Sequence, residues 1–465
     1  MTLHRVVNLI CDIANLNNMA AIITNDKLVE AENLCTELYR IRDTFFSALV
    51  GEKEKRLQSM VDSIFECIAA CENNENLKGE RKTKATYLKG KANSVFQVYS
   101  EKAEKDLSKA VKLDPTNVDA WNCLGECFWK KQDFQTAKSC FDGALKQKRT
   151  RSTLRLLSML LRQIRPNKKT VKEQIEKARA NINESIKIAK EAVALDFNDA
   201  DSWYILGNAY LGSFFNLDHD PIDLKKALSS YERAAKFRDV NKSLLPDLFY
   251  NRAEVHTYTQ NYTKAVADYR KAYAIDPIGL QSLERIGIIE KKVKRASDLV
   301  KKKGGFKPKR LTAMCKSMLT NQHHLKLVEK VRNNKDEKLK AKVVGLSDLK
   351  EGQNPGTIVP LTFLVPIAGQ GDIPPVLLIM ADKDQNCVCL AMYKVGYDRL
   401  DFFNSKHVYH VMSPVYKTIE LDLGDESGKV TFPCIEMDHP RSLARDGTRL
   451  SEFYSHEFIK NQMKG

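Results

Sequence analysis

The sequence predicts a mainly α chain in two parts, a solenoid of helical hairpins followed by a small β-barrel. Two stretches share one motif, with a tryptophan, a Leu-Gly pair and an aromatic residue at the same spacings, beginning at Trp121 and at Trp203. Each is followed by alanines and an aromatic residue at helical spacing. Beyond residue 341 the pattern changes to short runs rich in β-branched and aromatic residues, separated by turns that contain glycine.

The motif at Trp121 predicts two short helices that cannot be stable alone. Trp121, Leu124 and Phe128 share one face of the first helix, and the second helix has its own apolar face. These faces are buried only if neighbouring hairpins stack on them, and the spacing is that of a tetratricopeptide repeat. We therefore look for the function on a surface built by several hairpins and not in a catalytic pocket.

Length, charge and cysteine content limit the possible classes. At 465 residues the chain is too long for one typical core, so we expect two or three domains. The net charge of +16 favours an acidic partner such as nucleic acid, the ribosome or an anionic membrane. Eleven cysteines without a C-x-x-C pattern indicate reduced thiols, and no apolar run is long enough to span a membrane. We expect a cytoplasmic and nuclear protein with no membrane partner.

We predict five segments. They are an N-terminal extension with a helix pair (1–80), tetratricopeptide repeats with a capping helix (81–300), a basic linker (301–335), an OB-fold domain (336–440) and a tail (441–465). Five repeats fit the middle segment, the third of them degenerate, and the fourth contains an inserted loop at 212–220. A polar-faced helix from Gln281 to Val300 is expected to cap the solenoid.

The basic linker has three interpretations. Residues 291–310 contain ten Lys and Arg against one Asp, and Gly304, Gly305 and Pro308 are expected to break any helix. The segment is a plain solvated linker, a nuclear import signal or a contact to RNA phosphates. Under the last interpretation the residues that contact nucleic acid or the ribosome are Lys301, Lys302, Lys303, Lys307, Lys309 and Arg310.

The C-terminal strands fit a small barrel of the OB-fold type. Five or six strands occur in about a hundred residues, at 342–345, 357–365, 376–380, 387–393, 408–415 and 430–435. The barrel has aromatic residues that could stack on single-stranded nucleic acid or form its core. These residues are Phe363, Tyr393, Phe402, Phe403 and Tyr409.

The first helices of the repeats are expected to line a groove with charges of alternating sign. If Trp121 packs inward, the second repeat presents Asp119, Asn122 and Glu126. In the degenerate third repeat, Arg155 and Arg162 lie seven residues apart on one face, with Ser158 between them. By the same offset as in the second repeat, the fourth and fifth repeats present Asp201, Tyr204 and Asn208, then Asp247, Tyr250 and Glu254. Such acidic, basic and acidic positions suit a short peptide that carries both charges. Exposed helix charges are also commonly just solvated, but two arginines within an apolar helix are harder to explain in that way.

Other candidate sites are weaker. Cys123 and Cys127 lie four residues apart on a helix and could bind a metal, but small thiols at packed repeat positions explain them better. No nucleophile elbow, phosphate-binding glycine loop or zinc-protease motif occurs. The sequence therefore predicts no enzyme, no cofactor and no metal.

The order of helix pair, five repeats and C-terminal barrel resembles the Strap family, also called the tetratricopeptide repeat protein 5 family. The motifs that show it are A-V-K-L-D-P at 110–115, A-W-N-C-L-G-E-C-F-W-K-K at 120–131, L-S-M-L-L-R-Q at 157–163 and S-W-Y-I-L-G-N-A-Y-L at 202–211. The match is dense from about residue 100 to 280. Over the barrel it depends on order and size.

The resemblance implies a nascent-chain sensor. Members of that family recognise the tubulin N-terminus, Met-Arg-Glu, as it leaves the ribosome, and recruit an mRNA-decay adaptor. By resemblance, the arginine that binds the peptide glutamate corresponds to Arg162, and the aspartate that binds the peptide arginine or amine corresponds to Asp247. The family's glutamate after the last D-P corresponds to Gln281, so either Glu284 substitutes for it or the affinity is lower. The predicted partners are the nascent tubulin peptide, the ribosome with its rRNA and a decay adaptor.

Two alternatives remain open from the sequence. The resemblance also implies a stress-responsive transcriptional co-activator scaffold, in which the barrel would bind DNA or a protein and the basic linker would direct import. A clamp for chaperone tails would need lysine and asparagine residues that bind a terminal carboxylate. The acidic positions at Asp119, Asp201 and Asp247 argue against that clamp.

Overall fold

The computed structural model describes most of the chain as two compact units. The described residues are 26–74, 78–164, 170–217, 219–241, 246–333, 341–367, 374–393, 403–424, 428–437, 442–446 and 448–449. The first unit comprises residues up to Leu248 together with Ala272–Leu280, and the second comprises Phe249–Lys271 and Gln281 onward. The division falls inside the fifth predicted repeat, so that hairpin contributes to both units.

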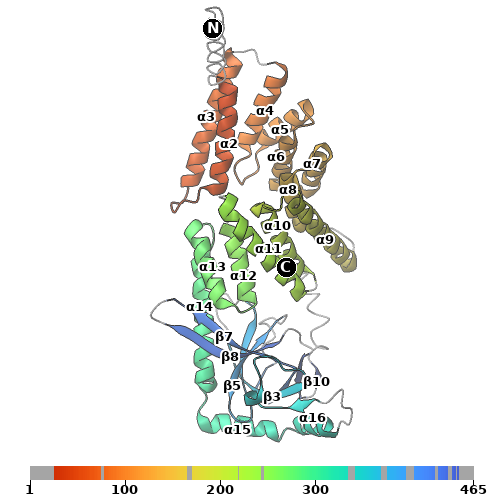
Figure 1. Cartoon of the computed structure of the whole chain (residues 1–465), viewed down its shortest axis with the longest axis vertical. Coiled ribbons are helices and arrows are strands. Elements are labelled where there is room, and N and C mark those ends of the chain that lie inside the picture. Colours follow the sequence, from red (N-terminus) through yellow and green to blue (C-terminus); the bar gives the residue numbers. More distant parts are fainter. Residues whose placement is uncertain are drawn as a thin grey trace, which may run out of the picture. The chain divides into compact units, whose positions relative to one another are not determined.

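The first unit is a stack of helical hairpins (Figure 1). Its helices are α2 (Lys27–Thr44), α3 (Glu52–Asn74), α4 (Gly79–Asn93), α5 (Glu101–Leu113), α6 (Val118–Lys130), α7 (Phe134–Gln147), α8 (Arg151–Gln163), α9 (Val171–Leu195), α10 (Ala200–Asn216) and α11 (Pro221–Asn241). Each even-numbered helix packs on the helix that follows it and on the even-numbered helix of the neighbouring hairpin. From α4 onward, each also packs on the odd-numbered helix that precedes it. The predicted N-terminal helix pair, α2 and α3, is therefore a hairpin in the same stack. We call the surface formed by α2, α4, α6, α8 and α10 the first-helix face.

The motif glycines allow the two helices of a hairpin to approach closely. A Cβ on Gly125 would lie 2.5 Å from the Phe141 ring, and a Cβ on Gly207 would lie 2.4 Å from the Tyr231 ring. Both aromatic side chains are fully buried. The motif thus consists of a ring on the second helix and a glycine opposite it on the first.

Two sequence predictions about connections differ from the structure. The predicted inserted loop at 212–220 is partly helical, because α10 continues to Asn216. The predicted linker at 301–335 contains α15 (Pro308–Leu319) and α16 (Gln322–Asn333) after the short 3-10 turn Lys303–Gly305. Gly304 and Gly305, both with positive φ, lie in the turn after α14, but Pro308 occupies the first turn of α15, where a missing N–H costs nothing.

The second unit is a closed β-barrel with helices. The strands are β1 (Lys342–Val343), β2 (Gly352–Gln353), β3 (Thr357–Ile367), β4 (Val376–Ala381), β5 (Cys387–Met392), β6 (Val408–Met412), β7 (Val415–Asp422), β8 (Lys429–Met437), β9 (Leu443–Arg445) and β10 (Thr448–Arg449). They pair in the order β10-β9-β6-β3-β4-β5-β8-β7-β2, with β5 and β8 parallel. Only Ser413 and Pro414 separate β6, which pairs with β3, from β7, which pairs with β8. These two strands therefore act as one bent strand that closes the ring, which is the OB-fold connectivity.

Both faces of the central strands are buried. Alternate residues of β4 and β5 point into the barrel, among them Leu378 and Leu390, and the remaining ones form a second core with the helices α12 (Pro246–Tyr258), α13 (Tyr262–Ile275) and α14 (Ser282–Lys301). From α14, Ile289, Val293 and Ala296 enter this second core. The helix predicted to cap an open solenoid thus covers the outer face of the barrel (Figure 1).

The four candidate barrel aromatics that the structure describes do not form a stacking surface. Phe363, Tyr393, Phe403 and Tyr409 are all buried, with exposed fractions of 9% or less. Phe402 lies outside the described residues. The two interpretations left open by the sequence are therefore resolved for these four side chains, which belong to the core.

Candidate functional site

Arg162 occupies the end of an apolar helix on the first-helix face. Thr150 caps helix α8 through its hydroxyl, which accepts a hydrogen bond from the N–H of Thr153, and Leu154, Leu157 and Leu161 are buried. Ser158 binds Ser185 of α9 through hydrogen bonds of 3.0 Å and 2.9 Å. Because the chain ends α8 one residue after Arg162, the guanidinium also benefits from the negative end of the helix dipole.

The Arg162 guanidinium has only long, neutral contacts. Its Nη1 donates to Ser158 Oγ at 3.5 Å and to the Ile205 carbonyl oxygen at 3.4 Å. No carboxylate pairs with it anywhere in the described ranges. Burial lowers the pKa of Arg162 to about 10, so the group stays charged at neutral pH at an energetic cost. A half-buried cation without a counter-ion is a typical feature of a binding site for an anion.

The hairpin of α10 and α11 shapes the surroundings of Arg162. The hydroxyl of Tyr231 donates to Asn208 Oδ1 at 2.7 Å, which fixes the orientation of that amide. Tyr204 lies beside Tyr231, with ring centres 6.3 Å apart. Gly212 leaves the space that the arginine uses, because a Cβ there would lie 3.2 Å from Arg162 Cδ. The sequence identified Asn208 but missed Gly212 and Tyr231, because the fully buried tyrosine occupies an ordinary repeat position.

Arg155, the other arginine of α8, is bound within the protein. Its Nη1 lies 2.7 Å from Asp199 Oδ2 and 3.3 Å from Asp201 Oδ2. Asp199 also caps α10 by accepting from the N–H of Ser202. The two arginines that the sequence grouped together thus differ: Arg155 joins α8 to the start of α10, and Arg162 has no acidic partner among the described residues.

Asp247 lies at the start of α12 and is exposed to solvent. Surrounding protein atoms, and then the negative charge of Asp276, raise the pKa of its carboxyl group. The described residues provide no cation that pairs with Asp247. Asp276 is held by the N–H groups of Ile278 and Gly279 at 3.3 Å and 2.8 Å. Two neighbouring carboxylates without a counter-ion form an arrangement that attracts a cationic group.

Glu254 and Gln281 belong to the second unit. Glu254 accepts a hydrogen bond from the Tyr269 hydroxyl at 2.6 Å and pairs with Arg285 at 3.0 Å, so both partners are internal. Gln281 is exposed at the start of α14 and makes no side-chain capping bond, and Glu284, three residues later, is also exposed. Glu254 is therefore occupied, whereas Gln281 remains accessible to a ligand.

The second repeat presents its predicted positions unevenly. Asp119 is exposed, but Asn122 is buried and accepts a hydrogen bond from Thr153 Oγ1 at 2.9 Å. Burial raises the pKa of Glu126, while Arg42 and Lys130 partly offset that effect. Asn122 is thus a link between α6 and α8 and not a ligand contact.

The basic segment forms an ordered, exposed surface on the second unit. Its six predicted contact residues are all exposed. Lys302 pairs with Asp298 at 2.8 Å, and the guanidinium of Arg310 lies 4.8 Å from the centre of the Phe306 ring. The cations stand at the end of α14 and the start of α15, so they are held by folded structure and not by a flexible linker.

Burial makes the two candidate metal-binding cysteines poor ligands. It raises the pKa of Cys123 to about 12 and that of Cys127 to about 11, so both stay protonated. Over the described ranges, no group of three or more His, Cys, Asp or Glu side chains has the geometry of a metal site. Within the same ranges, no helix is long and apolar enough to span a membrane.

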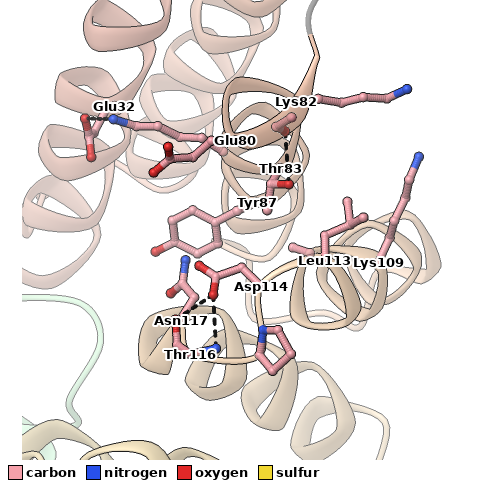
Figure 2. Close-up of a pocket in the computed structure, with 14 residues that line it drawn as sticks. Glu32, Glu80, Lys82, Thr83, Tyr87, Lys109, Leu113, Asp114, Thr116 and Asn117 are labelled. Atoms are coloured by element: carbon pink, nitrogen blue, oxygen red, sulfur yellow. Dashed lines mark hydrogen bonds and ion pairs between the residues drawn. The ribbon is translucent and has the colours of Figure 1, made fainter.

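A wide hollow of about 930 Å³ lies on the first unit between α4 and the turn from α5 to α6. Figure 2 shows Tyr87 pointing into it, with Asp114 held by Thr116 on one side and Glu32 on the other. Glu32 is already paired with Lys84. None of the predicted peptide-binding residues lines this hollow.

Comparison with known proteins supports both parts of the fold. The model of the tetratricopeptide repeat protein 5 OB fold domain matches residues 340–457, and a tetratricopeptide repeat model matches residues 246–278. The first of these matches extends past residue 440, where the sequence placed the end of the domain, and includes β9 and β10.

Relatives match over most of their length. Tetratricopeptide repeat protein 5 of Mus musculus is 34% identical over 372 residues, covering 79% of this chain and 82% of the relative. The Homo sapiens protein of the same name is 33% identical over 377 residues, with the same coverage. Among solved structures, YrrB, described as a tetratricopeptide protein with an unusual peptide-binding site, aligns at 22% identity with a TM-score of 0.29, covering 47% of this chain and 95% of that chain.

Proposed function

We propose, from the premise that this chain belongs to the tetratricopeptide repeat protein 5 family, that it is an adaptor which recognises the Met-Arg-Glu N-terminus of nascent tubulin. A protein-binding role follows from the repeats and the family. The particular peptide is our proposal, as is the tubulin mRNA decay that its recognition would trigger through a recruited adaptor.

The observation that supports this proposal most is the state of Arg162. A half-buried guanidinium with hydrogen bonds of 3.4 Å and 3.5 Å retains donors for a bidentate contact. The glutamate of the peptide would supply the missing counter-ion. Asp247 would bind the arginine or the terminal amine, since desolvation and then the negative charge of Asp276 raise the pKa of its carboxyl group and a cation would offset both.

The remaining predicted residues take different roles. Asn208, oriented by Tyr231, would hydrogen-bond the peptide backbone, and Gln281 would offer a neutral contact where the family has a glutamate. Arg155 and Glu254 have internal partners and would support the site without contacting the peptide. The exposed cations from Lys301 to Arg310 would contact ribosomal RNA.

Peptide binding tests the proposal directly. A fluorescent peptide that begins Met-Arg-Glu should bind the full chain, and changing its glutamate to glutamine should weaken binding to the native protein but not to the Arg162→Ala protein. Equal discrimination by both proteins would refute the pairing. Arg155→Ala is the matched control on the same helix, because its partners are internal.

We do not assign a nucleic-acid function to the barrel. Binding of single-stranded nucleic acid by the barrel would need aromatic residues available for stacking, and the four candidates that are described lie in the core. A chromatin scaffold that uses other surfaces of this chain would be recognised by chromatin association that is lost on deletion of the barrel.

A further inference from the structure

The turn between α9 and α10 carries an aromatic residue where two other repeats carry proline. Pro277 has this place in A-Y-A-I-D-P. The stretches A-V-K-L-D-P and A-V-A-L-D-F, each followed by a tryptophan six residues after its last residue, end in Pro115 and Phe197. At both turns the next tryptophan donates its indole N–H to the carbonyl oxygen of that residue, at 2.9 Å from Trp121 and 2.7 Å from Trp203. The backbone carbonyl therefore accepts the same tryptophan hydrogen bond whether the residue is proline or phenylalanine.

The ring of Phe197 is only partly used by the fold. It meets Trp203 and Phe237 edge-on, with ring centres 5.1 Å and 5.9 Å apart, yet 54% of the residue stays exposed. Proline would stiffen the turn and expose less apolar surface. The phenylalanine thus leaves an apolar contact surface at a place where folding does not need one.

Arg233 of α11 lies over this aromatic pair. Its guanidinium carbon is 4.6 Å from the Trp203 ring centre and 5.4 Å from that of Phe197. The side chain is exposed, and none of the carboxylates in the described part of the chain pairs with it. A guanidinium stacked on a ring keeps its N–H groups at the edge, oriented for a carboxylate.

The same arrangement continues along α10. Tyr210 follows Trp203 by seven residues and so lies on the same side of the helix. Lys226 Nζ of α11 and Lys190 Nζ of α9 lie 5.3 Å and 6.0 Å from its ring centre. Lys226 also lies 3.4 Å from Asp223. We call these residues the cation–aromatic strip: Lys190, Phe197, Trp203, Tyr210, Lys226 and Arg233.

We propose that the cation–aromatic strip binds an acidic segment of a partner protein in which a carboxylate stands next to an apolar side chain. The apolar side chain would cover Phe197 and the carboxylate would pair with Arg233. The exposed Glu232, together with the half-buried Asp223 that pairs with Lys226, would repel a continuous phosphate backbone, so the charge pattern favours a protein over RNA. The proposal is independent of the tubulin peptide, since none of these residues belongs to that site.

Anisotropy with a short labelled peptide in which phenylalanine and leucine alternate with pairs of glutamate tests this proposal. We expect Phe197→Pro and Arg233→Glu each to weaken its binding at least about tenfold. Phe197→Pro should leave the fold intact, because the Pro115 turn shows that proline supports the same tryptophan hydrogen bond. Asp196, which precedes it, already has the extended backbone that proline requires.

Two matched controls isolate the strip. Val171→Asp alters a residue of equal exposure, 53%, and Lys102→Glu makes the same charge change on α5 as Arg233→Glu. Both should bind within about twofold of the native chain. Failure of the native chain to bind the peptide, or equal losses in Lys102→Glu and Arg233→Glu, would overturn the proposal. The proposal would also be overturned if the native chain bound an oligouridine instead of the peptide and Arg233→Glu abolished that binding. Binding of the Met-Arg-Glu peptide should be unchanged in both strip variants.

Discussion

Replacing Arg162 by methionine should make the protein more stable and less able to bind its peptide. Methionine has a similar length and no charge, so it fills the same space between α8 and α10 without the cost of a half-buried cation. The substitution removes two hydrogen bonds, of 3.4 Å and 3.5 Å, to neutral oxygens. Removing a charge without a counter-ion from such a site should raise the free energy of unfolding by about 1 kcal/mol.

The same Arg162→Met substitution should weaken peptide binding. Loss of one partner of a desolvated, charge-assisted pair costs about 2–3 kcal/mol, which corresponds to a loss of affinity of roughly 30- to 150-fold. Denaturant unfolding of the unliganded chain and anisotropy with the Met-Arg-Glu peptide measure the two quantities separately. A purely structural arginine would lose stability and binding together.

Arg155→Met is the control for this prediction. Its guanidinium pairs with Asp199 at 2.7 Å and with Asp201 at 3.3 Å. Its loss should lower the free energy of unfolding by about 1 kcal/mol and change peptide affinity by less than about twofold. Destabilisation by Arg162→Met as large as that by Arg155→Met, or native-like peptide binding by Arg162→Met, would refute this explanation.

Three further outcomes are expected. Gly212→Ala should keep or slightly raise helix stability but weaken peptide binding about three- to tenfold, because the new Cβ would lie 3.2 Å from Arg162 Cδ; anisotropy and circular dichroism measure the two effects. The buried His410 has its Nε2 3.2 Å from His324 Nδ1, and burial lowers the pKa of His410 to about 4. In the folded protein this imidazole therefore stays neutral, whereas in the unfolded chain it takes up a proton below about pH 6.5. Stability should therefore fall as the pH drops from about 6.5 towards 4, by about 2 kcal/mol at pH ~5, and urea unfolding of His410→Phe should show a smaller pH dependence. Replacing Lys303, Lys307 and Lys309 by glutamate reverses their charge and should reduce both ribosome co-sedimentation and its salt dependence. The same replacement at the exposed Lys102, Lys105 and Lys112 should change neither.

Local patterns were enough to predict the repeats and most of the strands. The glycine and aromatic residues of the motif are required by one close contact between two helices, so their spacing survives in sequence. The strand β7 (Val415–Asp422) escaped prediction beyond its first residue, because one face of it is exposed and its polar residues hide the alternation. The helices α15 and α16 were missed because basic residues and a proline were interpreted as a break.

For the candidate site, too, some features could be predicted from the sequence and others depended on the tertiary structure. The sequence alone determined that this chain is a repeat solenoid with a barrel. It singled out Asp247 and Asn208 by their offset from the inward-facing repeat residues, and Arg162 as a charge in an apolar helix, because both features are visible without a structure. Only the tertiary structure decided that Arg155 and Glu254 have internal partners and that Arg162 has no acidic one among the described residues. Only the structure, likewise, showed that the barrel aromatics are core and that Phe197 and Arg233 meet on one surface. The reason is physical: a charge or a ring takes its role from what lies within a few ångströms of it, and those neighbours come from other helices and strands.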